Sequence, residues 1–194
     1  MNLQQPNLLS FAFVDPTMLF STMTLKYGRH FGDAERKWGR SVPPFQDCQA
    51  IILRGPAVKK GGSEDWLEDA EQVDYPLMAD WPSARQIIAS VGSKITEQLG
   101  AENFQFGRVY IESLRAGGVI GWHADESAYA KAHQRFQLLI SPCAGGCWFS
   151  AGESLAPGVG NLTYFNNRVL HSAINIGPVP QISLVLDIRR PQLQ

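Results

Sequence analysis

The chain is poor in cysteine, and the few cysteines do not suggest a covalent framework. Cys48, Cys143 and Cys147 are an odd number in 194 residues, which argues against paired disulfides and favours a reducing compartment. Cys143 and Cys147 are spaced as C-x3-C, but no second cysteine pair completes a zinc site, so we interpret them as small buried side chains. We therefore expect a cytoplasmic protein.

Net charge and long apolar runs are also lacking. The 17 basic and 18 acidic residues leave a formal net charge of −1, so nothing global attracts phosphate backbones or anionic membranes. The N-terminus has neither the basic opening of a signal peptide nor an apolar run long enough to span a membrane. We expect no membrane partner and no nucleic-acid partner, and the basic stretch 54–62 is the one candidate for a nucleic-acid groove.

The remaining composition is that of a globular protein. Hydrophobic residues make up 44% of the chain and charged residues 18%, which separates it from disordered proteins. No repeat or low-complexity segment divides the chain, and its length suits one domain with a sizeable core. We predict a single domain over 1–194, with a mixed helical part over about 1–100 and a β core over about 101–191.

The clearest helix is predicted over 83–99, because apolar residues recur there at every fourth position between a proline and a glycine. These residues are Ile87, Val91, Ile95 and Leu99. A second helix is predicted over 16–27 and a strand over 48–55. The polar segment 56–82 is too long for a simple connection, so we expect a lid or a mobile insertion there.

After Gly100 the pattern changes to short apolar runs separated by turn residues. Runs at this spacing indicate a β-sandwich or a β-barrel. They read FGRVYIESL, GVIGWHAD, RFQLLISP, GCWFSA, NLTYF, VLHSAIN and QISLVLDI. We predict a mainly β fold with flanking helices, built as an antiparallel double sheet of the jelly-roll type.

The stretch GWHADES contains a candidate pair of metal ligands, His123 and Asp125. Residues two apart on a strand share a face, so both side chains can aim at one point, although a lone H-x-D is weak evidence. His171, on another predicted strand, completes the facial triad of non-haem Fe(II) oxygenases. The alternative is a buried core histidine beside a surface H-x-D, and the spacing leaves both open. The other histidines, His30 and His133, are expected in solvent.

A series of short motifs follows a fixed order within residues 48 to 191. They are a predicted helix ending in LGA, then SLRAGGVIGWHAD, RFQLLI, GESLAPG, YFNNRVLHSAINIG and ISLVLDIRRP. By their order and spacing the chain resembles the aspartyl/asparaginyl β-hydroxylase family of Fe(II)- and 2-oxoglutarate-dependent dioxygenases. The resemblance implies a double-stranded β-helix, which is a jelly-roll or cupin-like core, with iron held by His123, Asp125 and His171. It also implies O2 and the co-substrate 2-oxoglutarate.

The resemblance implies a hydroxylase that acts on an unactivated C–H bond. The expected substrate is an amino-acid residue in a peptide, a free amino acid or a small metabolite, because members of the family act on each of these. The oligomeric state is not implied. Two other functions stay open, namely a cupin-like metal-binding module without 2-oxoglutarate turnover and a nucleic-acid oxygenase, which needs a basic groove.

The chain departs from the family pattern at the residue that would anchor 2-oxoglutarate. The family has an arginine ten residues after the second histidine, where this chain has Gln181. An arginine suits a carboxylate because its planar guanidinium binds two oxygens at once. Arg135 matches a second family arginine and is our preferred anchor, with Ser113 and Ser183 as hydroxyl donors. Alternatively, Gln181 indicates a different or weakly held oxo acid. A third explanation is an arginine from another strand. The candidates are Arg115, Arg168 and Arg189.

Three further residues near the motifs have two interpretations each. Trp122 and Trp148 either wall the pocket or belong to the core, the commoner role for tryptophan on a strand. Asn175 either orients the metal-bound imidazole or has the turn role that is commoner for asparagine.

Overall fold

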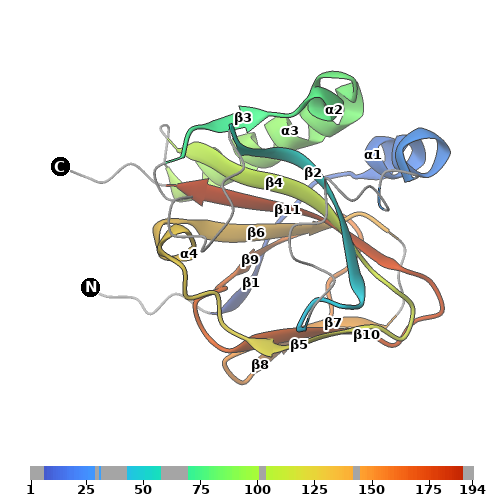
Figure 1. The fold of residues 1–194 in the computed structure, drawn as a ribbon, viewed down its shortest axis with the longest axis vertical. Helices are drawn as coiled ribbons and strands as arrows, with labels where there is room; N and C mark the ends of the chain where they lie inside the picture. The colour runs from blue at the N-terminus through green and yellow to red at the C-terminus, as the bar shows by residue number, and fades with distance from the viewer. Residues whose placement is uncertain are drawn as a thin grey trace.

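The structure, a computed structural model, contains two antiparallel sheets that face each other (Figure 1). The described residues are 7–28, 31, 43–57, 70–100, 104–141 and 145–189. Strands adjacent in space are often distant in sequence, as in the order β9-β6-β11-β4. The chain thus has the predicted mainly β architecture with flanking helices, a jelly-roll double-stranded β-helix.

Within the described residues the larger sheet has seven strands and the smaller sheet has four. The larger sheet contains, in spatial order, β1 (Leu8–Phe13), β9 (Asn161–Phe165), β6 (Gln134–Leu139), β11 (Gln181–Arg189), β4 (Gln105–Leu114), β2 (Cys48–Pro56) and β3 (Gln72–Asp74). The smaller sheet contains β5 (Val119–His123), β10 (His171–Asn175), β7 (Gly146–Ser150) and β8 (Glu153–Leu155).

Helices cover the face of the larger sheet that points away from the smaller sheet (Figure 1). They are α1 (Thr17–Thr22), the π-helical turn η1 (Met23–Tyr27) that extends it, α2 (Pro76–Ala79) and α3 (Pro82–Leu99). A further short helix, α4 (Ala128–Ala132), lies between β5 and β6. The predicted helices over 16–27 and 83–99 and the predicted strand over 48–55 are confirmed.

The larger sheet separates two interiors of different chemistry. On β6, Phe136 and Leu138 point toward the helices and join an apolar core with α3. Arg135 and Gln137 alternate with them and point into the space between the sheets, where both are buried. Other strands also place buried polar side chains on this inner face. They include Glu112, Thr163, Ser183 and Asp187. The helix-side core therefore stabilises the fold, while the inner face carries the polar groups that chemistry needs.

The segment 56–82 is only partly described. Its last part forms β3 and α2, whereas residues 58–69 lie outside the described residues, so the expected lid stays a prediction. Within the described part of the chain, no helix is both long enough and apolar enough to cross a membrane. Cys147, which was expected to be buried, is partly exposed, and Cys143 lies outside the described residues, whereas Cys48 is buried.

The helix α3 supplies much of the helix-side core. The buried positions of its apolar stripe include Ile87, Val91 and Ile95, and the helix ends at Gly100, whose φ of 62° is left-handed.

Ile95→Ala would leave a cavity where the wild-type side chain is 0% exposed, so we expect a loss of about 2–5 kcal/mol in the free energy of unfolding. Urea denaturation measures this. The exposed control Gln98→Ala should change it by less than about 0.5 kcal/mol.

Candidate metal centre

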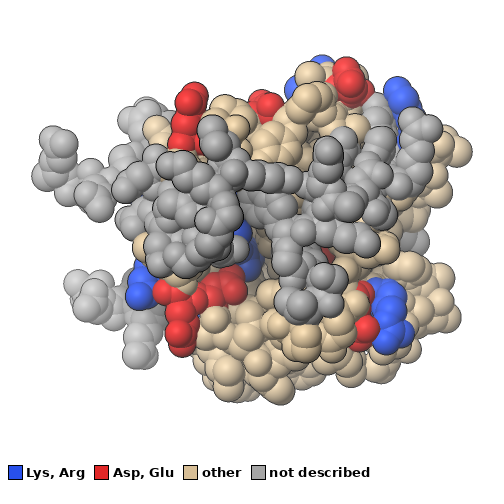
Figure 2. Space-filling view, in the orientation of Figure 1, with Lys and Arg blue, Asp and Glu red and all other residues tan. Residues whose placement is uncertain are grey.

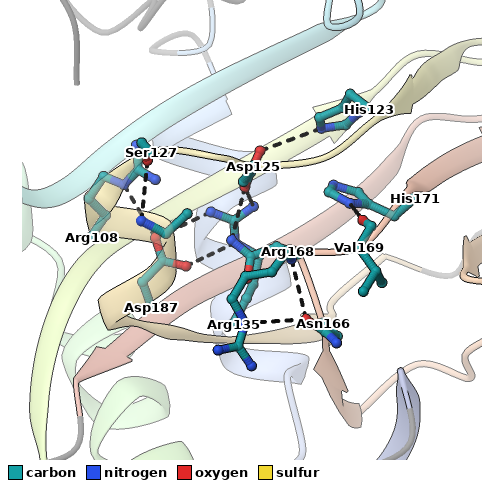
Figure 3. Close-up of polar contacts among 12 residues, drawn as sticks. Arg108, His123, Asp125, Ser127, Arg135, Asn166, Arg168, Val169, His171 and Asp187 are labelled. Atoms are coloured by element: carbon teal, nitrogen blue, oxygen red, sulfur yellow. Dashed lines mark hydrogen bonds and ion pairs between the residues drawn. The ribbon is translucent and has the colours of Figure 1, made fainter. Parts of the chain in front are cut away.

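The structure brings together His123, Asp125 and His171, the three residues predicted to bind metal (Figure 3). His123 ends β5 and His171 begins β10, and the two residues lie opposite each other in the antiparallel pair. Their ring centroids are 4.1 Å apart, and His123 Nε2 is 3.7 Å from Asp125 Oδ1. One ligand atom from each residue lies within 4.8 Å of the others. The cluster is compact enough to surround one ion.

The route by which the three side chains converge differs from the predicted one. Asp125 is not on the strand: β5 ends at His123, and the Asp125 backbone N–H donates to Asn167 O at 2.8 Å beyond it. The pairing of β5 with β10 also shifts register, because Ala173 faces Ile120 while His171 faces His123. The extra residue on β5 is a β-bulge, which re-aims the side chains that follow it.

The bulge decides which side chains of β5 face the inner side. Ile120 and His123 both line the cavity between the sheets, although their separation of three residues would place them on opposite faces of a regular strand. Trp122 consequently points outward, is 57% exposed and packs against Phe149. Trp148, by contrast, is buried and lines the cavity.

Both imidazoles are held by the backbone through the nitrogen that faces away from the cluster. His123 Nδ1 lies 2.8 Å from Gly121 O, and His171 Nδ1 lies 2.7 Å from Val169 O. When Nδ1–H donates to a carbonyl, the tautomer is set and Nε2 carries a free lone pair. Each histidine therefore offers Nε2 to a metal in a fixed orientation.

The protonation states suit metal binding. Burial lowers the pKa of His171 to about 4, so its ring is neutral near pH 7. Burial raises the pKa of Asp125, but Arg135, the Asn167 amide and the two imidazoles lower it more, so the carboxyl stays ionised. In the part of the chain that the structure describes, this is the one cluster of its kind. Two imidazoles and one carboxylate fit a divalent ion such as Fe(II), with three coordination positions left open.

Asn167 is a residue of this site that the sequence analysis did not single out. Its side-chain amide donates to Asp125 Oδ2 at 3.0 Å, so it holds the carboxylate from behind. Asn175, which was considered for a related role, has the turn role instead. Its amide group bonds to Leu114 O, Arg115 O, Val179 O and Gly177 N. A pair of adjacent asparagines before the second histidine was the signal in the sequence, but nothing local distinguished Asn167 from its neighbour.

Arg135 lies directly behind Asp125 and is already bound by two carboxylates. Its Nη1 donates to Asp125 Oδ2 at 2.8 Å and its Nε donates to Asp187 Oδ1 at 2.9 Å. Arg108 donates to the other oxygen of Asp187 at 3.2 Å. All these side chains except Asp125 are at least nine-tenths buried. The preferred anchor for an oxo acid is therefore engaged with the protein's own carboxylates.

The other residues expected to hold the co-substrate divide between the two faces of the larger sheet. Gln181 and Ser183 are buried on the inner face of β11, and Gln181 Oε1 has no hydrogen-bond partner among the described residues. A Cβ at Gly146 of the smaller sheet would collide with the Gln181 amide, which shows how closely the two sheets approach there. Ser113 shares the helix-side face of Ile111, so the structure corrects its expected place beside the co-substrate.

The third explanation was an arginine from another strand, and the structure places the three candidates away from the metal cluster. Arg115 pairs with Asp47 at 2.8 Å, and its side chain is 63% exposed. Arg168 is exposed and bonds to Asn166. Arg189 lines a different cavity, next to Arg54 and His133.

The cavity beside the metal cluster is small and mixed in character. Its volume is about 30 Å³, which is room for about one water molecule. Side chains of both sheets line it, among them Glu112, Gln137, Trp148 and Phe165. A metal ion needs no more room than this, but an oxo acid would bind only after lining side chains had moved.

His133 is buried, contrary to the expectation that it lies in solvent. It is 5% exposed, its Nδ1 lies 2.8 Å from Tyr129 O, and its ring stacks on that of Tyr129 with centroids 3.9 Å apart. The sequence around His133 is polar, which suggested that the side chain is exposed. In the structure α4 packs this segment against the first residues of β4, so the side chain is buried. His30 lies outside the described residues.

Comparison with known proteins gives similarity in structure but not in sequence. No family model matches the chain, and no curated protein matches it. A solved structure that is similar is the viral collagen prolyl hydroxylase of Paramecium bursaria Chlorella virus-1 in its 2OG complex. It is 11% identical with a TM-score of 0.56, and the match covers 98% of this chain and 99% of that chain.

Two bacterial structures give the same result. A Pseudomonas putida prolyl-4-hydroxylase is 14% identical with a TM-score of 0.53, over 94% of this chain and 91% of that chain. A Burkholderia pseudomallei oxidoreductase of the 2OG-Fe(II) oxygenase family is 15% identical with a TM-score of 0.54, and the match covers 74% of this chain and 68% of that chain. The chain has the fold of these oxygenases. At such identities the likeness is one of fold, so the finer resemblance to the aspartyl/asparaginyl β-hydroxylases stays a prediction.

Asn167→Ala should weaken metal binding without unfolding the protein. Loss of an outer partner of a metal ligand typically costs about 10–100-fold in affinity, and we expect a decrease of this size for Co(II). Isothermal titration calorimetry measures it. The matched control is Asn166→Ala, because Asn166 bonds to Asn7 and Arg168 but not to the cluster. Equal Co(II) affinities in the two variants would show that Asn167 does not support the metal site.

The burial of His133 predicts a pH dependence of stability. Burial lowers the pKa of His133 in the folded protein, so below about pH 6.5 the unfolded chain takes up more protons than the folded one. Stability should therefore fall from pH 7 to pH 5, and His133→Gln should show a smaller fall. Urea denaturation of the metal-free protein at both pH values tests this. An identical fall in the variant would mean that His133 does not contribute.

Proposed function

We propose that the protein is a single-domain, cytoplasmic dioxygenase of the aspartyl/asparaginyl β-hydroxylase type that depends on Fe(II) and 2-oxoglutarate. It hydroxylates an unactivated C–H bond of an amino-acid residue in a peptide, or of a free amino acid or small metabolite. The observation that carries the proposal is the set of two backbone-anchored imidazoles and one ionised carboxylate within 4.8 Å on the inner face of a double-stranded β-helix. This is the donor set of non-haem Fe(II) oxygenases.

His123, Asp125 and His171 would hold the iron, which together with 2-oxoglutarate and O2 supplies the oxidising chemistry for the C–H bond. The residues of the chain fix geometry and exclude water. The carbonyls of Gly121 and Val169 hold the two rings so that both Nε2 atoms are available to the metal. Buried aromatic side chains line the adjoining cavity and keep bulk water from the reacting carbon.

The tail of the co-substrate would lie along β11, toward Ser183 and Gln181. Both are buried on the inner face, where the Ser183 hydroxyl and the side-chain NH2 of Gln181 are groups that can donate to a carboxylate. A neutral amide and a hydroxyl bind a carboxylate less strongly than an arginine does. We therefore propose that 2-oxoglutarate is bound weakly, or that an oxo acid with a different tail takes its place.

One observation favours a second function, a cupin-like metal-binding module without 2-oxoglutarate turnover. The cavity beside the cluster, about 30 Å³, is smaller than an oxo acid. A nucleic-acid oxygenase has less support. In the described part of the face shown in Figure 2, basic side chains lie among acidic ones rather than in one patch, and Arg54 is paired with Asp74. We expect no nucleic-acid partner, and a small or peptidyl substrate.

Uncoupled turnover tests the proposal. Protein reconstituted anaerobically with Fe(II) and 2-oxoglutarate is exposed to O2, and succinate is quantified by mass spectrometry. We expect succinate from the wild type and only background amounts from His123→Ala and His171→Ala. Removal of an outer partner of a metal ligand costs about 10–100-fold, and the loss of a ligand itself should exceed this. His133→Ala is the control, because this buried histidine lies outside the triad.

Two results would contradict the proposal. Wild-type activity in either triad variant would show that the triad does not hold the iron. No succinate from the wild type, together with no binding of 2-oxoglutarate to the Zn(II) form, would favour the metal-binding module.

A further inference from the structure

Four alternating charges extend in a chain from the metal cluster along the inner face of the larger sheet (Figure 3). Arg135 bridges Asp125 and Asp187, and Arg108 binds the far oxygen of Asp187. Each of the two carboxylates in this chain of charges is paired with at least one guanidinium group. Apolar residues fill the other face of the same strands, so these four charges are confined to the inner face.

Asp187 is the centre of this chain of charges and is fixed by three strands. It lies on β11 directly opposite Arg135 of β6, next to the register shift between β11 and β4, the strand that carries Arg108. It is 1% exposed. Burial raises the pKa of Asp187, but Arg135 and Arg108 lower it more, so it stays ionised. A buried carboxylate of this kind is tolerated because guanidinium groups donate to both of its oxygens.

Arg108 is held in turn by α4. Its backbone N–H donates to Tyr129 Oη at 2.6 Å, and its guanidinium carbon lies 4.3 Å from the centre of the Tyr129 ring. Gly107 makes this approach possible, because a Cβ there would collide with Tyr129 Oη and the His133 ring. The far end of the chain of charges is therefore rigid, which leaves Arg135 little freedom to turn away from Asp125.

The two oxygens of Asp125 consequently have different surroundings. Oδ2 accepts from Arg135 at 2.8 Å and from Asn167 at 3.0 Å, whereas Oδ1 faces His123 Nε2 at 3.7 Å. A carboxylate held in this way presents one oxygen to a metal and keeps the other for its protein partners.

We propose that Asp187 is a positioning residue, which fixes Arg135 and thereby holds Asp125 so that Oδ1 alone binds the metal. Arg135 is then the link between the two carboxylates and not the anchor of the co-substrate. The inference rests on the metal site of the proposed function, but it does not require 2-oxoglutarate turnover. On this proposal the tail of the co-substrate is bound by the neutral side chains of Ser183 and Gln181 on β11 and not by Arg135.

The Co(II) form tests this without any activity assay. Asp187→Asn keeps the shape of the side chain but removes its charge, so Arg135 is no longer fixed. We expect Co(II) affinity to fall by about 10–100-fold and the visible d–d absorption of the bound Co(II) to change. The control is Asp74→Asn, which removes a carboxylate paired with Arg54 at the edge of the sheet. It should leave both the affinity and the spectrum at wild-type values.

Arg135→Lys is the second variant, and it decides the matter if Asp187→Asn does not fold. Lysine keeps the charge, but its single ammonium group cannot reproduce the fork that spans Asp125 and Asp187. We expect the same change in the Co(II) spectrum. At saturating Zn(II), the affinity of this variant for 2-oxoglutarate should stay within a few-fold of the wild type.

Each contrary outcome has a distinct meaning. An unchanged Co(II) affinity and spectrum in a folded variant would overturn the positioning role and leave a structural ion pair. Unchanged metal binding with lost 2-oxoglutarate binding in Arg135→Lys would make Arg135 the anchor after all. If 2-oxoglutarate does not bind even to the wild type, the proposed oxygenase function fails, whereas the Co(II) comparison still decides the role of Asp187.

Discussion

The pairing of β10 with β5 is the constraint on which the candidate metal centre depends. It sets His171 opposite His123, and the extra residue on β5 turns the His123 imidazole inward while Trp122 points out. A slip of one residue in such a pair exchanges the two faces of a strand. The carbonyls of Gly121 and Val169 belong to the same local geometry, so ring orientation and strand register are set together.

Such a site is tolerated because the larger sheet keeps its two faces chemically apart. The helix-side core is apolar and includes fully buried residues such as Ile95 and Leu184, so burial there supplies the driving force for folding. The inner face can then hold Arg135, Asp187 and Arg108, whose burial costs free energy unless each charge is paired. Each of these charges has an oppositely charged partner in the chain of charges, which holds the three side chains in place.

The same rigidity bears on how an oxo acid would be held. An arginine that already binds two carboxylates has less to offer a third than a free arginine would. The groups farther along β11, Ser183 and Gln181, are neutral, and the cavity beside the metal cluster is about 30 Å³. Co-substrate binding in this protein would therefore depend on movement of lining side chains and on hydrogen bonds more than on an ion pair.

The sequence by itself determined the elements and the identity of the cluster, because periodicity and residue type are local properties. The four-residue spacing in 83–99 was enough to predict α3, whereas the H-x-D motif with His171 left the triad open until the family resemblance favoured it. Only the tertiary structure decided that Asp125 lies beyond the strand, that Ser113 faces the helices and that His133 is buried. These features depend on bulges and on register between strands far apart in the chain, which no local pattern encodes.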